Sequence, residues 1–468
     1  MHLYQALSDY SRRDICPLHM PGHKRRACHS PGLPWHLDIS EIDGFDNLHT
    51  PEGVLLEAEA RAARLFGSEG AYFLINGSSG GILAGIYACT RPGDAILIAR
   101  NCHKAVYHAV EILGLCPIYL EPPILAEAGI AGSISPQAVE RALEARPDIR
   151  LAVITSPTYE GVLSDVGGIA EVLCRRGIPL FVDEAHGAHL GLSSHFSPGA
   201  IQQGADLVVQ SLHKTLPSLT QTAILHRSGG LISPAALRHA LGVFQSTSPS
   251  YLLLAAIDGC IAFLEAEGEA PFDAWRARLE RFYEAMADLE RLKLFGGAGA
   301  HIYAHDPGKL SIVCGGANLT GGALLAALRE DFGIELEMAL PGYALAMTGL
   351  ASTDEDLERL GDALRALDRA CQPASQAALP IQLPPMPAQV IPAGEALRLP
   401  GRRVGFAESV GQISRGYVWA YPPGVPLVAP GTRITQAVAD CLAELIARQV
   451  VLRSTFDVGW GSMEVVES

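Results

Sequence analysis

The chain has 468 residues, 49% of them apolar, which allows two or three domains around a large buried core. Its formal net charge is −15 and its pI is near 5.5, and it has no basic run beyond Lys24-Arg25-Arg26, which argues against a nucleic-acid-binding protein. The start of the chain lacks the apolar region of a signal peptide, and no stretch approaches the roughly 18 apolar residues of a membrane span. We therefore expect a cytoplasmic protein that acts on small molecules and binds neither nucleic acid nor membrane.

The ten cysteines show no C-x-x-C spacing, and several stand inside apolar runs. This distribution predicts reduced thiols that are mostly buried, rather than a disulfide framework or a structural zinc site.

Residues 1–48 are rich in turn-forming and polar residues around Met20-Pro21-Gly22-His23, which predicts an N-terminal arm instead of a compact unit. Two histidines and two aspartates in this arm are conceivable metal ligands: His19, His23, Asp43 and Asp46. Their irregular spacing matches no ligand motif, so hydrogen-bonded loop residues are the better interpretation.

From residue 49 to 270 the pattern predicts a large domain. Thr50-Pro51 has the form of a helix start, and Gly67 ends that helix. Strands then alternate with helices: strands at 71–75, 95–99, 117–120, 151–155 and 180–183, and helices at 79–88, 101–113, from 135, and at 169–175. This alternation predicts a mostly parallel sheet with helices on both faces, whose ligands lie at the carboxyl ends of the strands.

The residue pattern after position 270 predicts three further segments. Residues 271–370 have the pattern of a smaller α+β domain, and residues 371–400 contain seven prolines, which is typical of an extended linker. Residues 401–468 form a C-terminal segment that contains Tyr421-Pro422-Pro423-Gly424 and ends with an amphipathic helix at 435–450.

A lysine stands at the end of one buried strand. Ser211-Leu212-His213-Lys214-Thr215 follows the apolar run 206–210, and uncharged polar neighbours of this kind favour a lysine that acts as a Schiff-base nucleophile. About thirty residues earlier, Phe181-Val182-Asp183 is another apolar strand that ends in an acid. A Schiff-base lysine, with an aspartate for the pyridinium nitrogen, is the pair that pyridoxal phosphate requires.

Two further features follow strands of the predicted sheet. Asn76-Gly77-Ser78-Ser79-Gly80-Gly81 lies between a strand and a helix, where backbone N–H groups, hydroxyls and the helix dipole can hold a phosphate. It is neither a G-x-G-x-x-G motif nor a Walker loop. His103 begins the helix after the next strand, where a lone histidine is usually a helix cap or a surface residue.

These motifs resemble those of a known family, the ornithine/lysine/arginine decarboxylases. The resembling stretches are 182–189, 211–216, 18–24, 100–104 and 421–426. The resemblance covers nearly the whole chain and implies an α/β protein of the aspartate-aminotransferase fold (fold type I), with a large domain that binds pyridoxal 5'-phosphate and a smaller C-terminal α+β domain.

The resemblance also implies roles for individual residues. Lys214 would hold the cofactor, Asp183 would pair with its ring nitrogen, His103 would stack on the ring, and His186 would position it. The phosphate would be anchored by a glycine and three serines: Gly77, Ser78, Ser79 and Ser211. His213 or Lys214 would protonate the substrate carbon after carbon dioxide leaves, and the sequence does not choose between them.

The implied reaction is decarboxylation of a basic amino acid for polyamine biosynthesis, with L-arginine to agmatine favoured over lysine or ornithine. Glu337 is the candidate partner of the cationic side chain, because 333–338 partly matches the family's substrate-side segment. The family further implies a homodimer or higher even oligomer, with the arm reaching the partner's site. Large rings are not expected, because the chain starts almost at the arm, without the wing domain of larger members.

Three other readings were weighed. A metal-dependent hydrolase would use four residues as ligands: Asp183, Glu184, His186 and His189. Their spacing is not that of the helical H-E-x-x-H motif, and Gly187 and Gly191 indicate a loop, so we expect no metal site. A silent binding protein on the same fold would not need the Asp183 and Lys214 pair. An aminotransferase usually needs an arginine for the substrate carboxylate, which a decarboxylase must leave free.

Overall fold

The structure is a computed structural model, and it describes residues 2–14, 16–21, 23–26, 32–125, 129–374, 383–420, 425–448, 450–456 and 461–467. The predicted motif Tyr421-Pro422-Pro423-Gly424, part of the predicted arm and part of the predicted linker lie outside these residues. Among the described residues, every helix is too short or too polar to span a membrane.

The chain divides into two compact units, each built from separate stretches. The first contains Met1–Cys89, Pro179–Ala274 and Gly349–Ala351, and the second contains Thr90–Ile178, Trp275–Thr348 and Ser352–Ser468. The five segments expected from the sequence are a division along the chain, and their boundaries stay a prediction.

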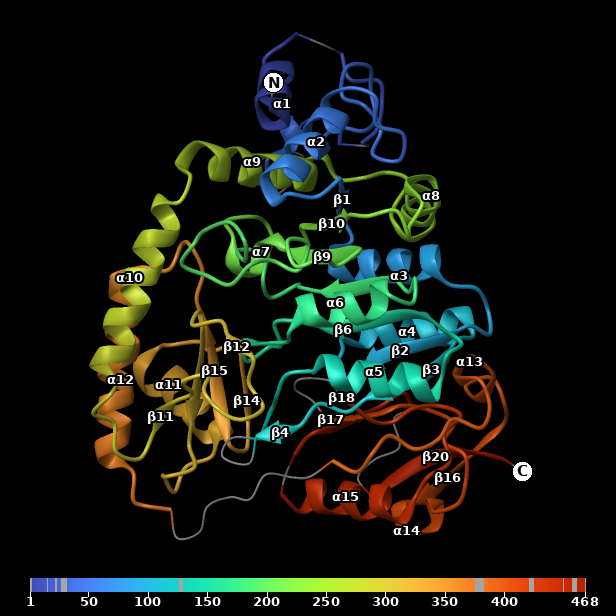
Figure 1. Ribbon diagram of the computed structural model, residues 1–468. Helices are drawn as coiled ribbons and strands as arrows, with labels where there is room; N and C mark the ends of the chain where they lie inside the picture. The colour runs from blue at the N-terminus through green and yellow to red at the C-terminus, as the bar shows by residue number, and fades with distance from the viewer. Residues whose placement is uncertain are drawn as a thin grey trace. The chain divides into compact units, whose positions relative to one another are not determined.

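The first unit contains four neighbouring strands of a sheet, in the order β1-β10-β9-β8, and all of their residues except Gly70 and Arg227 are buried (Figure 1). β8 and β9 are parallel, whereas β10 is antiparallel to both β9 and β1. Its elements are α1 (Leu3–Ser11), η1 (Trp35–Leu37), α2 (Val54–Phe66), β1 (Gly70–Leu74), α3 (Gly77–Cys89), β8 (Leu180–Asp183), β9 (Leu207–Ser211), α7 (Leu212–Thr215), β10 (Ala223–Arg227), α8 (Pro234–Phe244) and α9 (Tyr251–Glu267). The helix α10 (Ala270–Ala285) contains the boundary between the units.

Helix α3 packs closely on this sheet because it presents glycines to it. A Cβ atom at Gly81 would lie 2.5 Å from Leu74, and one at Gly85 would lie 2.5 Å from Phe181. Larger residues at these two positions would push the helix away from the strands. The glycine-rich start of α3 therefore fixes the distance between the helix and the strand ends that carry the predicted site.

The second unit begins with three parallel strands in the order β6-β2-β3 and the helices that connect them. The elements of this part are β2 (Ala95–Ala99), α4 (Lys104–Leu113), β3 (Cys116–Leu120), β4 (Ile124–Leu125), β5 (Ile130–Ala131), α5 (Pro136–Ala145), β6 (Ile149–Thr155), β7 (Val162–Leu163) and α6 (Val166–Cys174). The predicted start of α5 is confirmed, since Ser135 Oγ accepts a hydrogen bond from Ala138 N at 3.2 Å and Pro136 is the first helical residue.

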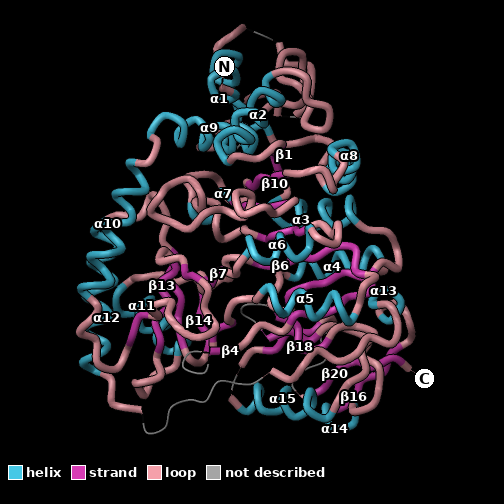
Figure 2. The backbone as a smooth tube through the Cα atoms, in the orientation of Figure 1, coloured by secondary structure: helices cyan, strands magenta, loops and turns pink. Residues whose placement is uncertain are grey.

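A four-stranded antiparallel sheet follows in the order β11-β13-β15-β14, and α11 packs against β14 and β15 (Figure 2). The elements of this part are β11 (Lys293–Leu294), β12 (Ala304–His305), β13 (Lys309–Val313), α11 (Gly321–Phe332), β14 (Met338–Leu340), β15 (Tyr343–Met347) and α12 (Asp354–Ala370). Helix α12 begins with a complete capping box between Thr353 and Asp356.

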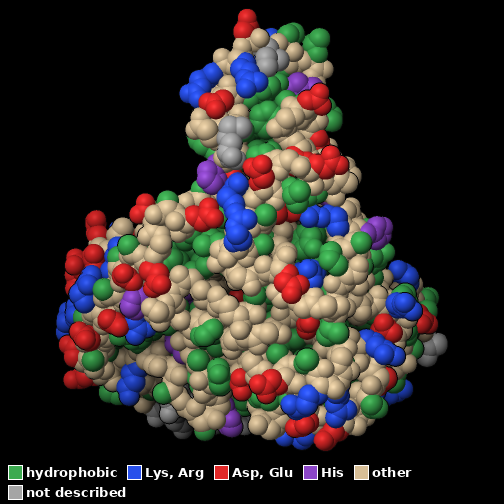
Figure 3. Space-filling view, turned by 45° about the horizontal axis from the view of Figure 1, so that its top comes forward, with side chains coloured by type: hydrophobic (Ala, Val, Ile, Leu, Met, Phe, Trp, Pro, Cys, Tyr) green, Lys and Arg blue, Asp and Glu red, His purple; other side chains and the backbone are tan. Residues whose placement is uncertain are grey.

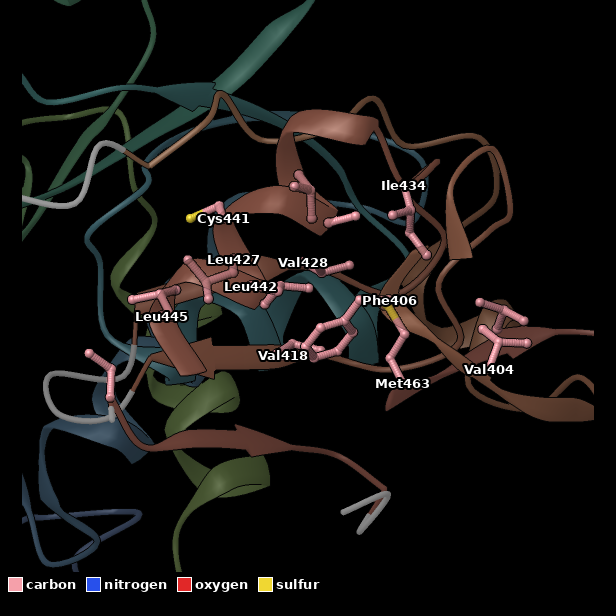
Figure 4. Packing of buried hydrophobic residues seen from close by; sticks show 14 residues of the cluster. Val404, Phe406, Val418, Leu427, Val428, Ile434, Cys441, Leu442, Leu445 and Met463 are labelled. Carbon is pink, nitrogen blue, oxygen red and sulfur yellow. The ribbon is translucent and has the colours of Figure 1, made fainter. Parts of the chain in front are cut away.

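The C-terminal part of the second unit has its own apolar core, which gathers side chains from α15 and the strands around it (Figure 4). Its elements are α13 (Ala393–Ala396), β16 (Gly401–Gly405), α14 (Phe406–Ser409), β17 (Val418–Ala420), β18 (Val425–Val428), α15 (Gln436–Ala447), β19 (Leu452–Ser454) and β20 (Ser462–Val466). Thr435 caps α15, as the sequence predicted for the last helix.

Two expectations from the sequence need correction. Helix α2 begins at Val54 and not at Thr50-Pro51, because the Asp46 carboxylate accepts hydrogen bonds from the N–H groups of Glu52, Gly53 and Leu55. The nine described cysteines are free, but only four of them are buried: Cys102, Cys260, Cys314 and Cys441.

Candidate active site

Lys214 lies in α7, the single helical turn that follows β9. Its Nζ is 2.8 Å from Nε2 of His186, which stands in the turn after β8. Because an ammonium group only donates, Nε2 of His186 accepts this bond, and its ring proton is on Nδ1. The parallel pairing of β8 and β9 is what brings these two sequence motifs together.

Asp183 is the last residue of β8, and only 3% of it is exposed. Its Oδ1 accepts a hydrogen bond from Ala185 N at 3.1 Å, and no donor to Oδ2 is present among the described residues. Burial raises the pKa of this carboxyl group, and the positive charge of Lys214 acts in the opposite direction. The strand end therefore presents a buried carboxylate oxygen beside the candidate lysine.

Two of the predicted phosphate anchors meet in the structure. Ser78 lies in the first turn of α3 and Ser211 ends β9, and their Oγ atoms are 2.6 Å apart. Ser79 is exposed in the same turn. Gly77 has a φ of +66°, which side chains disfavour, and its N–H donates to the carbonyl of Gln221 at 3.1 Å. Two serine hydroxyls and the start of a 13-residue helix thus form a group suited to a phosphate.

His213 is half-buried beside Lys214, and its Nδ1 lies 3.0 Å from the carbonyl oxygen of Thr222. Since a carbonyl accepts, Nδ1 carries the ring proton. Burial lowers the pKa of His213, and the charge of Lys214 lowers it further. This histidine is therefore neutral near pH 7.

Two predicted site residues lie in the second unit. His103 caps α4, and its Nδ1 accepts a hydrogen bond from Ala105 N at 3.2 Å. Glu337 is exposed just before β14, and its N–H donates to Leu345 O at 3.0 Å. Stacking by His103 and substrate contact by Glu337 stay predictions.

Glu184, one ligand of the metal-site alternative, has other partners. Glu184 accepts hydrogen bonds from Ala200 N at 2.9 Å and from Gln210 Nε2 at 2.7 Å. In the arm, His23 contacts Asp38 at 3.1 Å. Within the described ranges, no group of three His, Cys, Asp or Glu side chains is arranged to hold a metal ion.

Sequence reasoning considered Glu184 only as a metal ligand and missed Gln210 and His226, which are buried with it behind the site. Gln210 and His226 interrupt two otherwise apolar strands. This interruption was the available signal, because a polar side chain in a buried strand must find a hydrogen-bond partner.

Comparison with known proteins identifies the family of this chain. The family model described as "Orn/Lys/Arg decarboxylase, major domain" matches residues 1–295. The arginine decarboxylase of Bacillus subtilis is 32% identical over 446 residues, which cover 93% of this chain and 91% of the relative. The arginine decarboxylase of Bacillus anthracis is 32% identical over 447 residues, which cover 93% and 90%.

The fold has solved counterparts. The lysine decarboxylase LdcF of Francisella novicida superposes with a TM-score of 0.85 at 20% identity, covering 99% of this chain and 81% of that one. The likeness at this level of identity concerns the fold, and it confirms the fold class that the motifs implied.

Proposed function

The chain belongs to the Orn/Lys/Arg decarboxylase family, and on this premise we propose that it converts L-arginine to agmatine and carbon dioxide with pyridoxal phosphate as cofactor. One observation supports arginine as the substrate. Relatives named arginine decarboxylase align with more than nine tenths of this chain and with nine tenths or more of their own length. The relatives named lysine and ornithine decarboxylase align less completely. As a decarboxylase of this family, the chain is an enzyme.

The residues at the strand ends fit the cofactor. The unengaged oxygen of the buried Asp183 suits a protonated ring nitrogen, because a buried carboxylate gains most from a cationic partner. Ser78 and Ser211, 2.6 Å apart at the start of α3, suit a phosphate. Lys214 supplies the amine for the covalent link. When bound there, the cofactor accepts the electron pair that carbon dioxide leaves behind.

Side chains of the protein would hold the ring proton, orient the lysine and return a proton to the substrate. Asp183 stays ionised and keeps the ring nitrogen protonated, and His186 orients Lys214 through the 2.8 Å contact. Neutral His213 already donates its ring proton to Thr222 O, so it is a weak proton donor near pH 7. We assign the proton that returns to the substrate carbon to Nζ of Lys214.

Two further roles are part of this proposal. His103 stacks on the cofactor ring, and Glu337 binds the guanidinium of the substrate. No group pairs with the Glu337 carboxylate in the part of the chain that the structure describes, and an exposed carboxylate of this kind is available to a cationic ligand.

The proposal extends to assembly, role and location: a homodimer that makes a polyamine precursor in the cytoplasm. The acidic and basic side chains are interspersed over the visible face (Figure 3), and the net charge of −15 favours attraction of a cationic substrate. Light scattering tests the dimer, and a monomer with full activity would contradict it.

Substrate comparison tests the activity. We expect carbon dioxide release with kcat/KM highest for arginine, lower for lysine and ornithine, and lowest for a neutral amino acid. Borohydride reduction followed by peptide mapping should place the cofactor mass on Lys214. A preference for the neutral substrate, formation of a keto acid without carbon dioxide, or cofactor on another lysine would overturn the proposal.

A further inference from the structure

A continuous line of hydrogen bonds in the first unit runs from Ser68 to Glu184, the residue that follows Asp183 in the chain. Gln210 Nε2 lies 2.7 Å from Glu184 Oε2, Gln210 Oε1 lies 3.0 Å from His226 Nε2, and His226 Nδ1 lies 3.2 Å from Ser68 Oγ. Glu184, Gln210 and His226 are 2%, 3% and 0% exposed, whereas Ser68 is partly exposed. This line of hydrogen bonds therefore connects a buried carboxyl group, that of Glu184, to a partly exposed hydroxyl, that of Ser68.

The sheet register accounts for this line. Gln210 of β9 is paired with Ile224 of β10, so His226 is its diagonal neighbour on the same face. Glu184 directly follows the last residue of β8, and its N–H donates to Val209 O at 3.0 Å. Three side chains that lie far apart in the sequence are thus held in contact by backbone pairing.

Hydrogen-bond chemistry gives this line two possible directions. If Glu184 is ionised, the Gln210 amide donates to it, His226 donates from Nε2 to Gln210, and Ser68 donates to Nδ1. If Glu184 carries a proton, its O–H needs an acceptor, and a 180° turn of the Gln210 amide provides one. His226 must then move its ring proton to Nδ1 and donate to Ser68. One proton on Glu184 therefore sets the direction of all three bonds.

The groups that face Glu184 decide its charge. Asp183 precedes Glu184 in the chain. The Gln210 amide of β9 and the N–H of Ala200, in the loop between β8 and β9, both donate hydrogen bonds to the Glu184 carboxyl group. Behind Gln210, burial lowers the pKa of His226 to about 3, so the ring is neutral. Burial raises the pKa of Glu184 to about 8, and the charge of Asp183 acts in the same direction.

We propose that Glu184 is a positioning residue for the cofactor end of the site, and that its proton, held through Gln210 and His226, controls how much negative charge stands beside Asp183. With the proton in place, Asp183 carries a negative charge at the end of β8 and Glu184 does not. Without it, a second negative charge strengthens the hold on the positive charges of Lys214 and the cofactor ring nitrogen. This inference rests on the proposed cofactor but not on the identity of the substrate.

The main test is a pH titration of the cofactor's visible absorbance in the holoenzyme without substrate. In the wild type the second charge forms only as pH rises through about 8, and in Glu184→Gln it cannot form, so we expect the part of the titration above about pH 8 to lie about one pH unit lower in the variant than in the wild type. Glu184→Asp keeps an ionisable group and should retain a midpoint closer to the wild type. A Glu184→Leu variant should show the same downward shift as Glu184→Gln, because it also removes the charge.

Glu59→Gln is the matched control. Glu59 is a buried carboxyl group of the same unit, and burial also raises its pKa, but its partners are Arg238 and Phe73 N. We expect this variant to lose stability while its cofactor titration stays at the wild-type midpoint. If Glu184→Gln and Glu59→Gln both match the wild type within about 0.2 unit, or both shift equally, the proposal is refuted.

Thermal unfolding provides a second readout. A folded-state pKa above the unfolded value means that the folded protein binds the extra proton, so wild-type stability falls as pH rises from the ordinary glutamate pKa of 4.5 to about 8. Glu184→Gln has no carboxyl group to titrate and lacks this loss of stability. The melting temperature of the variant minus that of the wild type should therefore increase as pH rises from 5 to 8.5. A constant difference across this range would contradict the proposal. A wild-type protein without cofactor on Lys214 would instead refute the proposed function.

Discussion

Each unit contains a lysine close to an aspartate, and the two lysines are held in opposite ways. In the second unit, Lys309 Nζ contacts Asp306 Oδ2 at 2.9 Å, and neither side chain is exposed. The other oxygen of Asp306 accepts from Gly308 N at 2.9 Å. In the first unit, Lys214 is half-buried and contacts the neutral ring of His186.

The difference is the one expected between a structural lysine, Lys309, and the proposed reactive lysine, Lys214. A buried ion pair with both carboxylate oxygens engaged stabilises the ammonium form of the lysine and fixes a turn. A lysine that donates to an imidazole, beside an aspartate with an oxygen available to a ligand, can lose its proton and form a covalent link. Proximity to an acid therefore does not by itself distinguish the proposed catalytic lysine from a structural one.

The largest expected effects come from removing each lysine. Lys214→Ala should lower kcat by about 10³-fold or more while the protein stays folded, because the nucleophile is lost. Lys309→Met should leave Asp306 buried without its ammonium partner and lower the free energy of unfolding by about 3–5 kcal/mol. Carbon dioxide release and denaturant unfolding measure the two effects. If Lys309→Met were as stable as the wild type but lost activity as Lys214→Ala does, the structural role given to Lys309 would be wrong.

The two aspartates should differ in the same way. Asp183→Asn keeps the shape of the side chain but removes the charge that holds the ring proton, so kcat should fall by about 10²-fold with little change in stability. The matched variant, Asp306→Asn, should lose mainly stability. Steady-state rates and thermal unfolding of both proteins check this expectation, and equal stability losses would contradict it.

Glu337→Gln should act on the substrate alone. Loss of one charge-assisted hydrogen bond at an exposed position should lower kcat/KM for arginine by about tenfold and leave a neutral amino acid unaffected. Competition assays with the two substrates measure the ratio. An unchanged ratio would remove only the role of Glu337.

The smallest expected effect is that of His213→Gln. A glutamine amide can still donate to Thr222 O, so kcat should change by less than about tenfold if Lys214 returns the proton. Single-turnover rates between pH 6 and 8 measure this step. A loss of about 10²-fold or more would identify His213 as the proton donor instead.

The sequence by itself determined the elements whose causes are local. The apolar runs that end at Asp183 and Ser211 were recognisable because a buried strand is a short apolar stretch followed by polar residues. Ser135 and Thr435 marked helix starts because a cap acts over three residues. Lys214 and Asp183 followed from the same patterns, joined with the family's motifs.

Only the tertiary structure decided the contacts between segments. The start of α2 depends on the Asp46 carboxylate, which lies outside the helix and accepts hydrogen bonds from Gly53 N and Leu55 N. The close packing of α3 depends on Gly81 and Gly85, which face the sheet. The line from Glu184 through Gln210 to His226 needs the pairing of β8, β9 and β10, which brings residues 26 and 16 positions apart into hydrogen-bond distance. Strand pairing is a non-local interaction, so local residue patterns predict that strands exist but not which polar side chains meet across them.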